Sequence, residues 1–253
     1  MFKKLASILA AALLTLAAGN AFAAFSNGDL IRVVYNHNGS VEAVTDLGSM
    51  SSLLSGGSTS TDTFSLSSIT GATSASDLYV AYFASNYVGA GNINQAYIGA
   101  ASAPTTGNRK YTTYNGNVSN LDVYYNGIST TATTIVGPQT GVNAYANLLG
   151  QLTNAGNLNG YITTGNGEQN LATLLASGGK TTVYAFTNQG GTSLITTGVA
   201  TTLVLDTNFD AATGIGSTSV SAATANTPIP AAAYLLGSGL LGLFGIRRRG
   251  NKA

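Results

Sequence analysis

The clearest β-hairpin signal in the chain lies in residues 29–44, DLIRVVYNHNGSVEAV. Residues 30–35 are mostly β-branched and aromatic side chains, which favour extended backbone. Asn38-Gly39 follows them, and this pair favours the tight turns that join antiparallel strands. Residues 40–44 then predict the returning strand, so this part of the chain opens an antiparallel sheet.

Further strand patterns continue along the chain. Residues 77–88 contain the apolar run LYVAYF, which is typical of a strand buried on both faces, and residues 95–101 are its expected partner. Strands are also predicted at 63–69, 110–114, 121–125, 182–187 and 194–206. The pair at 110–125 is rich in tyrosine and is expected to be joined through Asn115-Gly116-Asn117.

Apolar residues at helical spacing interrupt this pattern in two places. Residues 141–153 and 168–176 predict short amphipathic helices, and a third helical stretch is expected between Leu47 and Leu54 with Asp46 as its cap. Residues 24–210 are therefore expected to form a mainly β, β-sandwich-like antiparallel domain with a small helical insertion. Residues 211–227 carry few large side chains and predict a flexible stalk.

Charge is sparse in the region between the two ends of the chain. Residues 24–227 hold nine acidic and four basic side chains, and nine minus four gives a net charge of −5. A mildly acidic domain without a basic cluster is a poor nucleic-acid binder. The absence of cysteine excludes disulfides and thiolate metal sites.

Candidate catalytic and metal-binding residues are few. His37, the one histidine, lies in the predicted hairpin turn, where we expect it to be solvated, without a carboxylate or nucleophile beside it. Asp206, Asn208 and Asp210 alternate as in the first half of a calcium loop, but Ala211 and Ser217 depart from that pattern. A strand end turning through these residues is the favoured alternative. We expect no enzyme, no cofactor and no metal.

Tyrosine is the other conspicuous residue type. The tyrosines concerned are Tyr79, Tyr82, Tyr87, Tyr97, Tyr111, Tyr114, Tyr124 and Tyr125. They could stack on sugars if they were exposed in a row, or they could fill the core of the β domain, which is the favoured interpretation.

Residues 1–23 have the three parts of a secretory signal peptide. Lys3 and Lys4 precede an apolar run, and Ala21-Phe22-Ala23 supplies the small residues that signal peptidase reads. An uncleaved N-terminal anchor is the alternative, but the run is short for a membrane span. Cleavage after Ala23 would leave Ala24 as the mature N-terminus.

A second apolar segment, residues 231–246, ends at Arg247, Arg248 and Arg249. As a helix its 16 residues would rise about 24 Å, so Ile229 and its neighbours would have to extend it towards a hydrocarbon core of about 30 Å. The arginines predict a C-terminus held on the cytoplasmic side. A buried helix of the soluble domain is the alternative, although such a helix rarely ends in three arginines.

The tail at 228–253 resembles the PEP-CTERM sorting signal, which combines a Pro-x-Pro motif, a membrane helix and a basic cluster. Pro228, Ile229 and Pro230 match the motif, with Ile229 where the family has glutamate. The resemblance covers about a tenth of the chain. It implies that an exosortase, an integral-membrane, transpeptidase-like enzyme of Gram-negative bacteria, removes the tail near these prolines.

Together these features predict an exported protein, transiently anchored in the membrane and then delivered to the cell surface or an exopolysaccharide matrix. A structural or adhesive role in a biofilm is the leading hypothesis, and a secreted carbohydrate-binding module using exposed tyrosines is the alternative. Signal peptidase and an exosortase are the expected processing partners, and exopolysaccharide is a further candidate partner.

Overall fold

The computed structural model describes residues 25–56, 61–86, 93–107, 109–129, 132–150, 158–163, 167–189 and 198–222. All of them belong to the first of two compact units of the chain, which ends at Ala222. The expected signal peptide at 1–23, the sorting tail at 228–253 and its membrane helix at 231–246 lie outside the described residues.

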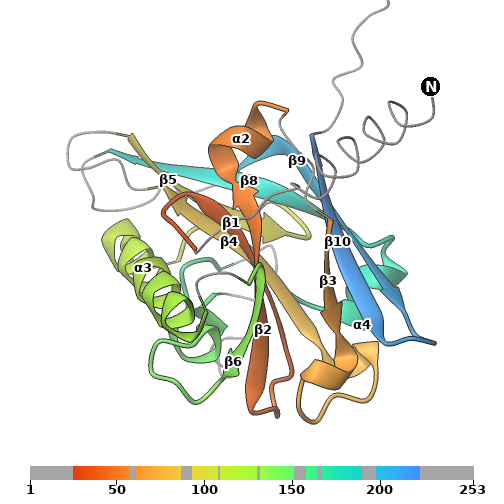
Figure 1. The fold of residues 1–253 in the computed structure, drawn as a ribbon. Coiled ribbons are helices and arrows are strands. Elements are labelled where there is room, and N and C mark those ends of the chain that lie inside the picture. The colour runs from red at the N-terminus through yellow and green to blue at the C-terminus, as the bar shows by residue number, and fades with distance from the viewer. Residues whose placement is uncertain are drawn as a thin grey trace, which may run out of the picture. The chain divides into compact units, whose positions relative to one another are not determined.

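The described ranges are mainly antiparallel β (Figure 1). The strands are β1 (Asp29–Tyr35), β2 (Val41–Ser49), β3 (Thr61–Ser65), β4 (Tyr79–Asn86), β5 (Ile93–Ala100), β6 (Thr134–Pro138), β7 (Glu168–Asn170), β8 (Lys180–Gln189), β9 (Val199–Asp210) and β10 (Ile215–Ala222). The helical segments are α2 (Met50–Leu54), α3 (Tyr111–Ile128) and α4 (Leu171–Ala176), with short 3-10 turns at Leu66–Ser68 and Ala75–Asp77 and a π-helical turn at Ala146–Gly150.

The predicted hairpin is confirmed. Strands β1 and β2 pair antiparallel, with Tyr35 opposite Glu42. Strand β4 lies on the other side of β1, and β5 pairs with β4, as the apolar run at 77–88 predicted. Every residue of β1 is buried, so this strand is covered on both of its faces.

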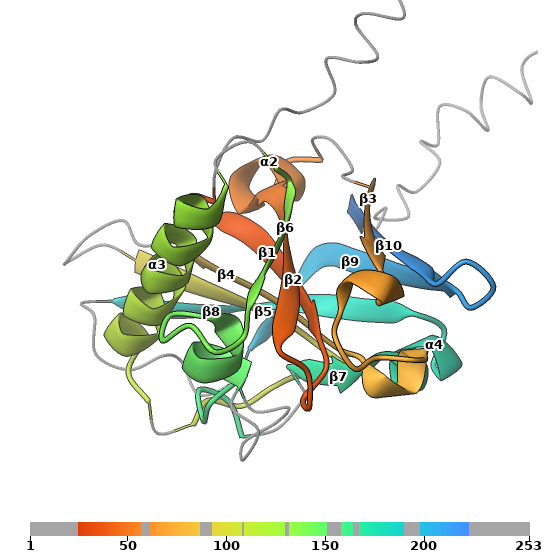
Figure 2. The same ribbon diagram turned by 60° about the horizontal axis from the view of Figure 1, so that its bottom comes forward.

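The ten strands join in one sheet with the order β3-β10-β9-β8-β5-β4-β1-β2-β6, and β7 pairs with β4. The sheet curls until its two end strands meet: Thr134 Oγ1 on β6 donates to Asp62 Oδ2 on β3 at 3.1 Å. Figure 2 shows β3 and β6 on the two sides of this junction, which we call the seam. The expected β-sandwich is therefore wrong in this respect, because one nearly closed sheet replaces two stacked ones.

The inner face of the curled sheet encloses one apolar core. Side chains from strands at both ends of the sheet meet there, including Leu30, Phe64 and Val220. Two short helices contribute to this core, α2 through Met50 and Leu53 and α4 through Leu171 and Leu174. The remaining members are Val34, Ala43, Leu47, Ile69, Leu78, Val80, Tyr82, Ala84, Tyr97, Val183, Leu203 and Leu205. The two short helices thus add apolar cover to the core that the strands enclose.

Arg32 also points to the inner side, and it is fully buried. Its guanidinium donates to Thr45 Oγ1 at 2.8 Å and to the backbone oxygen of Asp62 at 3.1 Å. It lies 4.9 Å from the ring centroid of Phe64, a cation–π distance. Because Asp62 and Phe64 both belong to β3, the contacts of Arg32 connect β1 to the end strand β3 across the inside of the sheet.

A second apolar core lies on the outer face of the sheet, under α3. Residues 110–114 and 121–125, expected to be two strands, are instead parts of this one helix. Tyr111, Tyr114, Val118, Leu121 and Tyr125 recur at intervals of three and four residues, so they share the buried face of α3. Asn115-Gly116-Asn117 continues the helix and makes no turn.

The other predicted helices are shorter than expected. Within 141–153 a π-helical turn covers Ala146–Gly150, and residues 151–153 lie outside the described ranges. Within 168–176 the first three residues form β7, and α4 follows with Asn170 as its N-cap. The helix predicted near Leu47–Leu54 is α2, capped by Ser49 instead of Asp46.

The expected stalk at 211–227 is wrong over much of its length. Residues 215–222 form β10, which pairs with β9 on one side and β3 on the other. Gly216, Thr218 and Val220 are the buried residues of β10, and Gly216 lies against the Phe64 ring, where a Cβ atom would not fit. In the part of the chain that the structure describes, no helix combines the length and apolar character needed to cross a membrane.

Candidate functional site

His37 forms the best-defined polar contact of the hairpin turn between β1 and β2. Its Nε2 lies 2.8 Å from Glu168 Oε1, and its ring stacks on Tyr79 at 3.6 Å between centroids with an interplanar angle of 10°. The imidazole side chain is 18% exposed and the Glu168 side chain 1%. The prediction of a solvated histidine without a carboxylate is therefore wrong.

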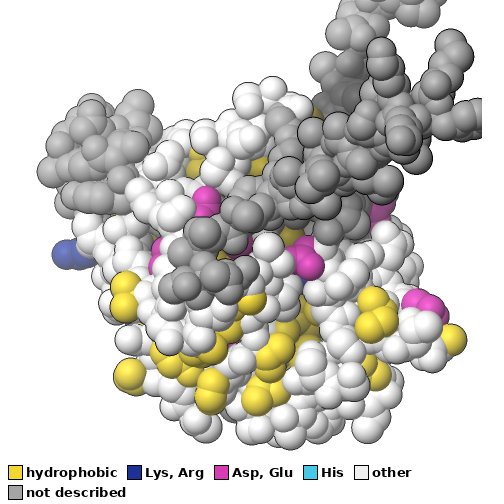
Figure 3. Space-filling view, in the orientation of Figure 1, with side chains coloured by type: hydrophobic (Ala, Val, Ile, Leu, Met, Phe, Trp, Pro, Cys, Tyr) yellow, Lys and Arg dark blue, Asp and Glu magenta, His cyan; other side chains and the backbone are white. Residues whose placement is uncertain are grey.

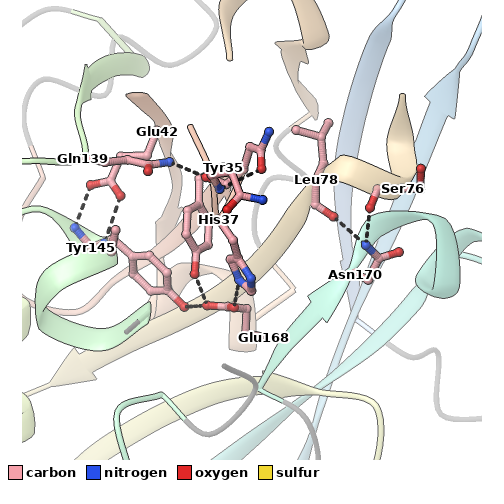
Figure 4. A network of polar contacts seen from close by, with 12 residues as sticks. Tyr35, His37, Glu42, Ser76, Leu78, Gln139, Tyr145, Glu168 and Asn170 are labelled. Carbon is pink, nitrogen blue, oxygen red and sulfur yellow. Dashed lines mark hydrogen bonds and ion pairs between the residues drawn. The ribbon is translucent and has the colours of Figure 1, made fainter. Parts of the chain in front are cut away.

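Glu168 is the centre of this network (Figure 4). Its Oε2 accepts hydrogen bonds from the hydroxyls of Tyr35 at 2.8 Å and Tyr145 at 2.9 Å. Burial, followed by the charge of Glu168, raises the pKa of Tyr35 and of Tyr145 above the ordinary value. Both hydroxyls therefore remain protonated and act as donors to the carboxylate.

The sheet explains how residues so far apart in sequence meet. Strand β4 pairs with both β1 and β7, which places Tyr79 opposite Tyr35 on one side and opposite Asn170 on the other. Ala81 lies opposite Glu168 in the same ladder. Asn170 then fixes the end of β7, since its Nδ2 donates to Ser76 O at 2.8 Å.

A second buried glutamate, Glu42, lies on the other side of Tyr145. Glu42 Oε1 accepts from Tyr145 N at 2.7 Å and from the hydroxyl of Tyr125, and Oε2 accepts from Ala146 N at 3.0 Å. Burial raises the pKa of Glu42 to about 8 against the lowering effect of the two backbone donors. Tyr145 thus connects the only two glutamates of the chain, with its amide on Glu42 and its hydroxyl on Glu168.

The chemistry open to this network is limited by how fully its groups are engaged. A His–Glu pair is two-thirds of a nucleophilic triad, but within the described ranges no Ser or Thr hydroxyl hydrogen-bonds to His37. All four carboxylate oxygens of Glu42 and Glu168 accept hydrogen bonds. Both glutamates are therefore engaged with groups of the domain itself. The geometry suits fixing the hairpin turn and the Ala146–Gly150 turn to the sheet.

The other candidate residues lie elsewhere. Asp206, Asn208 and Asp210 belong to β9, where alternation places them on one face of a strand and not around a loop. Asp210 accepts from Ala212 N and Thr213 Oγ1, which closes the turn into β10, as the Asx alternative predicted. Within the described ranges no three His, Asp or Glu side chains converge closely enough to hold a metal ion.

The tyrosines do not form an exposed row. Tyr82, Tyr97, Tyr111, Tyr114 and Tyr125 are buried, Tyr79 and Tyr124 are half-buried, and Tyr87 lies outside the described residues. The face in Figure 3 shows mostly uncharged polar side chains and backbone, with scattered charge and small apolar patches. The buried tyrosines pack in the two apolar cores, as the favoured interpretation of the sequence predicted.

The targeting residues lie outside the described ranges: Ala21, Ala23, Pro228, Ile229, Pro230, Arg247, Arg248 and Arg249. Sequence reasoning missed Glu42, Glu168 and Tyr145, whose contacts join positions that carry no shared local motif. Comparison with known proteins adds no relative, because no family model, no curated protein and no solved structure matches the chain.

Proposed function

We propose that this chain is an exported cell-surface or exopolysaccharide-matrix protein, structural or adhesive in role, whose tail an exosortase removes. The observation that carries the proposal is the order of three features in the tail: Pro228-Ile229-Pro230, the apolar run at 231–246 and Arg247–Arg249. The apolar amino-terminal segment ending in Ala21-Phe22-Ala23 supports export.

The extent of the described domain is compatible with both cleavages. The sheet is built from residues 29–222, so cuts after Ala23 and near Pro228 would remove none of its strands. Phe25, two residues after the first cut, is buried at 3% exposure. A mature chain from Ala24 to about Pro228 would keep every contact described above.

The engagement of Glu42, Glu168 and His37 in internal hydrogen bonds supports a non-enzymatic role. The burial of Tyr82, Tyr97, Tyr111, Tyr114 and Tyr125 argues against a carbohydrate-binding module that uses a row of exposed tyrosines. A surface of neutral hydrogen-bonding groups is compatible with a hydrated polysaccharide matrix, and exopolysaccharide remains the candidate partner.

Mass spectrometry of protein released from the surface of a Gram-negative host with an exosortase tests the proposal. We expect a mature form that starts at Ala24 and ends near Pro228. In the same host without the exosortase, the tail should remain and the protein should stay in the membrane fraction. A released protein that still carries Arg247–Arg249 would contradict the sorting proposal.

A further inference from the structure

Three buried carboxyl groups, at the start of β1, near the end of β2 and on α3, are close enough for the charges of the first two to act on the third. We call Asp29, Asp46 and Asp122 the carboxyl cluster; they are 8%, 4% and 8% exposed. Each comes from a different element, so only the folded sheet and helix bring them together. Within the described ranges this cluster is separate from the Glu42–Glu168 network.

Asp122 is the member that a structural role does not explain. Its Oδ1 is buried and has no hydrogen-bond partner among the described residues. An ionised carboxylate buried without a partner is strongly destabilising, whereas a protonated carboxyl is neutral and can donate its own hydrogen bond. The surroundings of Asp122 therefore favour the protonated form.

The neighbours of the cluster supply no compensating positive charge. Burial is the main reason that the pKa of Asp122 is raised to about 7, and the charges of Asp29 and Asp46 raise it further. Burial likewise raises the pKa of Asp46 to about 7, with Asp29 and then Asp62 of β3 as the charges that add to it. Arg32, the basic residue of β1, donates instead to Thr45 Oγ1 and to the backbone oxygen of Asp62.

A metal ion is a poorer explanation than protons. Within the described ranges no three acidic or histidine side chains, those of the cluster included, converge closely enough to hold a metal ion. Asp29 Oδ2 already accepts hydrogen bonds from Ser26 N at 2.8 Å and from Ser26 Oγ at 2.6 Å. Asp46 Oδ1 accepts one from Gly48 N at 2.7 Å. These bonds hold the loop before β1 and the end of β2.

The cluster is linked to the segment at residues 25–28. Asp29 binds Ser26, and Asn126, one helical turn after Asp122 on α3, binds both backbone polar groups of Phe25. Repulsion among ionised Asp29, Asp46 and Asp122 would push α3 away from the start of β1 and weaken the attachment of Phe25 to Asn126, whereas ionised Asp29 remains the stronger acceptor for Ser26. We propose that the carboxyl cluster is a proton-binding switch that holds Phe25 on α3 when protonated and loosens it when ionised.

Hydrogen–deuterium exchange of the full chain at about pH 5 and about pH 9, corrected for intrinsic exchange rates, tests the switch. We expect residues 25–29 and the adjoining turn of α3 to lose protection at the higher pH. In Asp122→Asn, which is neutral at both pH values, that protection should be equal at both. Glu42→Gln is the matched control, because it removes a buried acid outside the cluster and should leave the local loss intact.

Two outcomes would overturn the proposal. One is equal protection of residues 25–29 at both pH values in the unmodified chain. The other is restoration of protection at about pH 9 by added Ca²⁺ in the unmodified chain and not in Asp122→Asn, which would make the cluster a cation site. Asp29→Asn, which keeps an acceptor for Ser26, provides a second variant should Asp122→Asn fail to fold.

Discussion

Asn126 holds Phe25 by both of its backbone polar groups. Phe25 N donates to Asn126 Oδ1 at 2.9 Å, and Asn126 Nδ2 donates to Phe25 O at 2.8 Å, across 101 positions of sequence. The Phe25 ring packs 5.9 Å from that of Tyr125. The residue pair fastens the start of the described domain to α3.

Asn126→Ala should therefore lower the free energy of unfolding by about 1–3 kcal/mol, since it leaves two partly buried backbone groups without their partner. Urea unfolding at fixed pH measures the loss. Asn120→Ala, at an exposed position of the same helix, is the control and should change stability by less than about 0.5 kcal/mol. Equal effects of the two variants would contradict the role assigned to Asn126.

Glu168→Gln should destabilise more than His37→Gln. The first change removes the charge that Tyr35, Tyr145 and His37 share, at a cost of about 2–4 kcal/mol, because hydrogen bonds to charged groups are the stronger ones. The second change removes the contact of the partly exposed His37 ring with Glu168 and its stack on Tyr79, which should lower the free energy of unfolding by about 1 kcal/mol. Chemical unfolding of both variants and the double mutant gives the coupling, and a larger loss in His37→Gln would argue against Glu168 as the centre.

Glu42 makes stability depend on pH. Its pKa is raised to about 8 in the folded chain, so the folded state keeps a proton that the unfolded state releases above its ordinary pKa near 4.5. The free energy of unfolding should therefore fall as the pH rises from about 4.5 to about 8 and level off above that. Glu42→Gln should make this fall shallower, leaving the part due to the carboxyl cluster. Urea midpoints at several pH values measure it, and an unchanged slope would show that Glu42 does not titrate in this window.

Arg32→Ala should open the seam. It removes the donor to Thr45 and to the Asp62 backbone and leaves a cavity beside Phe64, so we expect a loss of about 2–4 kcal/mol. Arg109→Ala is the matched control, because Arg109 is exposed and its contacts within the described ranges are a hydrogen bond to Asn159 and the Tyr161 ring. Thermal unfolding compares the two. Similar melting temperatures would mean that Arg32 contributes little to closing the sheet.

The hairpin and β4 were predictable because their patterns are local. β-Branched runs and Asn38-Gly39 favour extended strands and a tight turn whatever they pack against. Helix α3 was not found, because tyrosines and two Asn-Gly pairs suggest strands and turns, and only the spacing from Tyr111 to Tyr125 indicates a helix. Strand β10 was missed because Ala, Ser, Thr and Gly dominate residues 211–222, and Gly216 is required where the strand lies against the Phe64 ring.

The polar network was beyond prediction for a different reason. His37 and Glu168 are 131 positions apart, and only the pairing of β4 with both β1 and β7 makes them neighbours. Likewise, no local pattern marks Glu42 of β2, which is a buried acceptor because the backbone amides of Tyr145 and Ala146 donate to it. Such contacts follow from the topology and not from any local motif.

The closed seam has a consequence for how copies of this domain can meet. A strand at the end of a sheet normally offers a row of unpaired amides and carbonyls to which a strand of another chain can add. Here β3 and β6, the two ends of the sheet, face one another across Asp62 and Thr134. A strand added to either edge at this point would have to break that contact, which disfavours association of neighbouring domains by extension of each other's sheets.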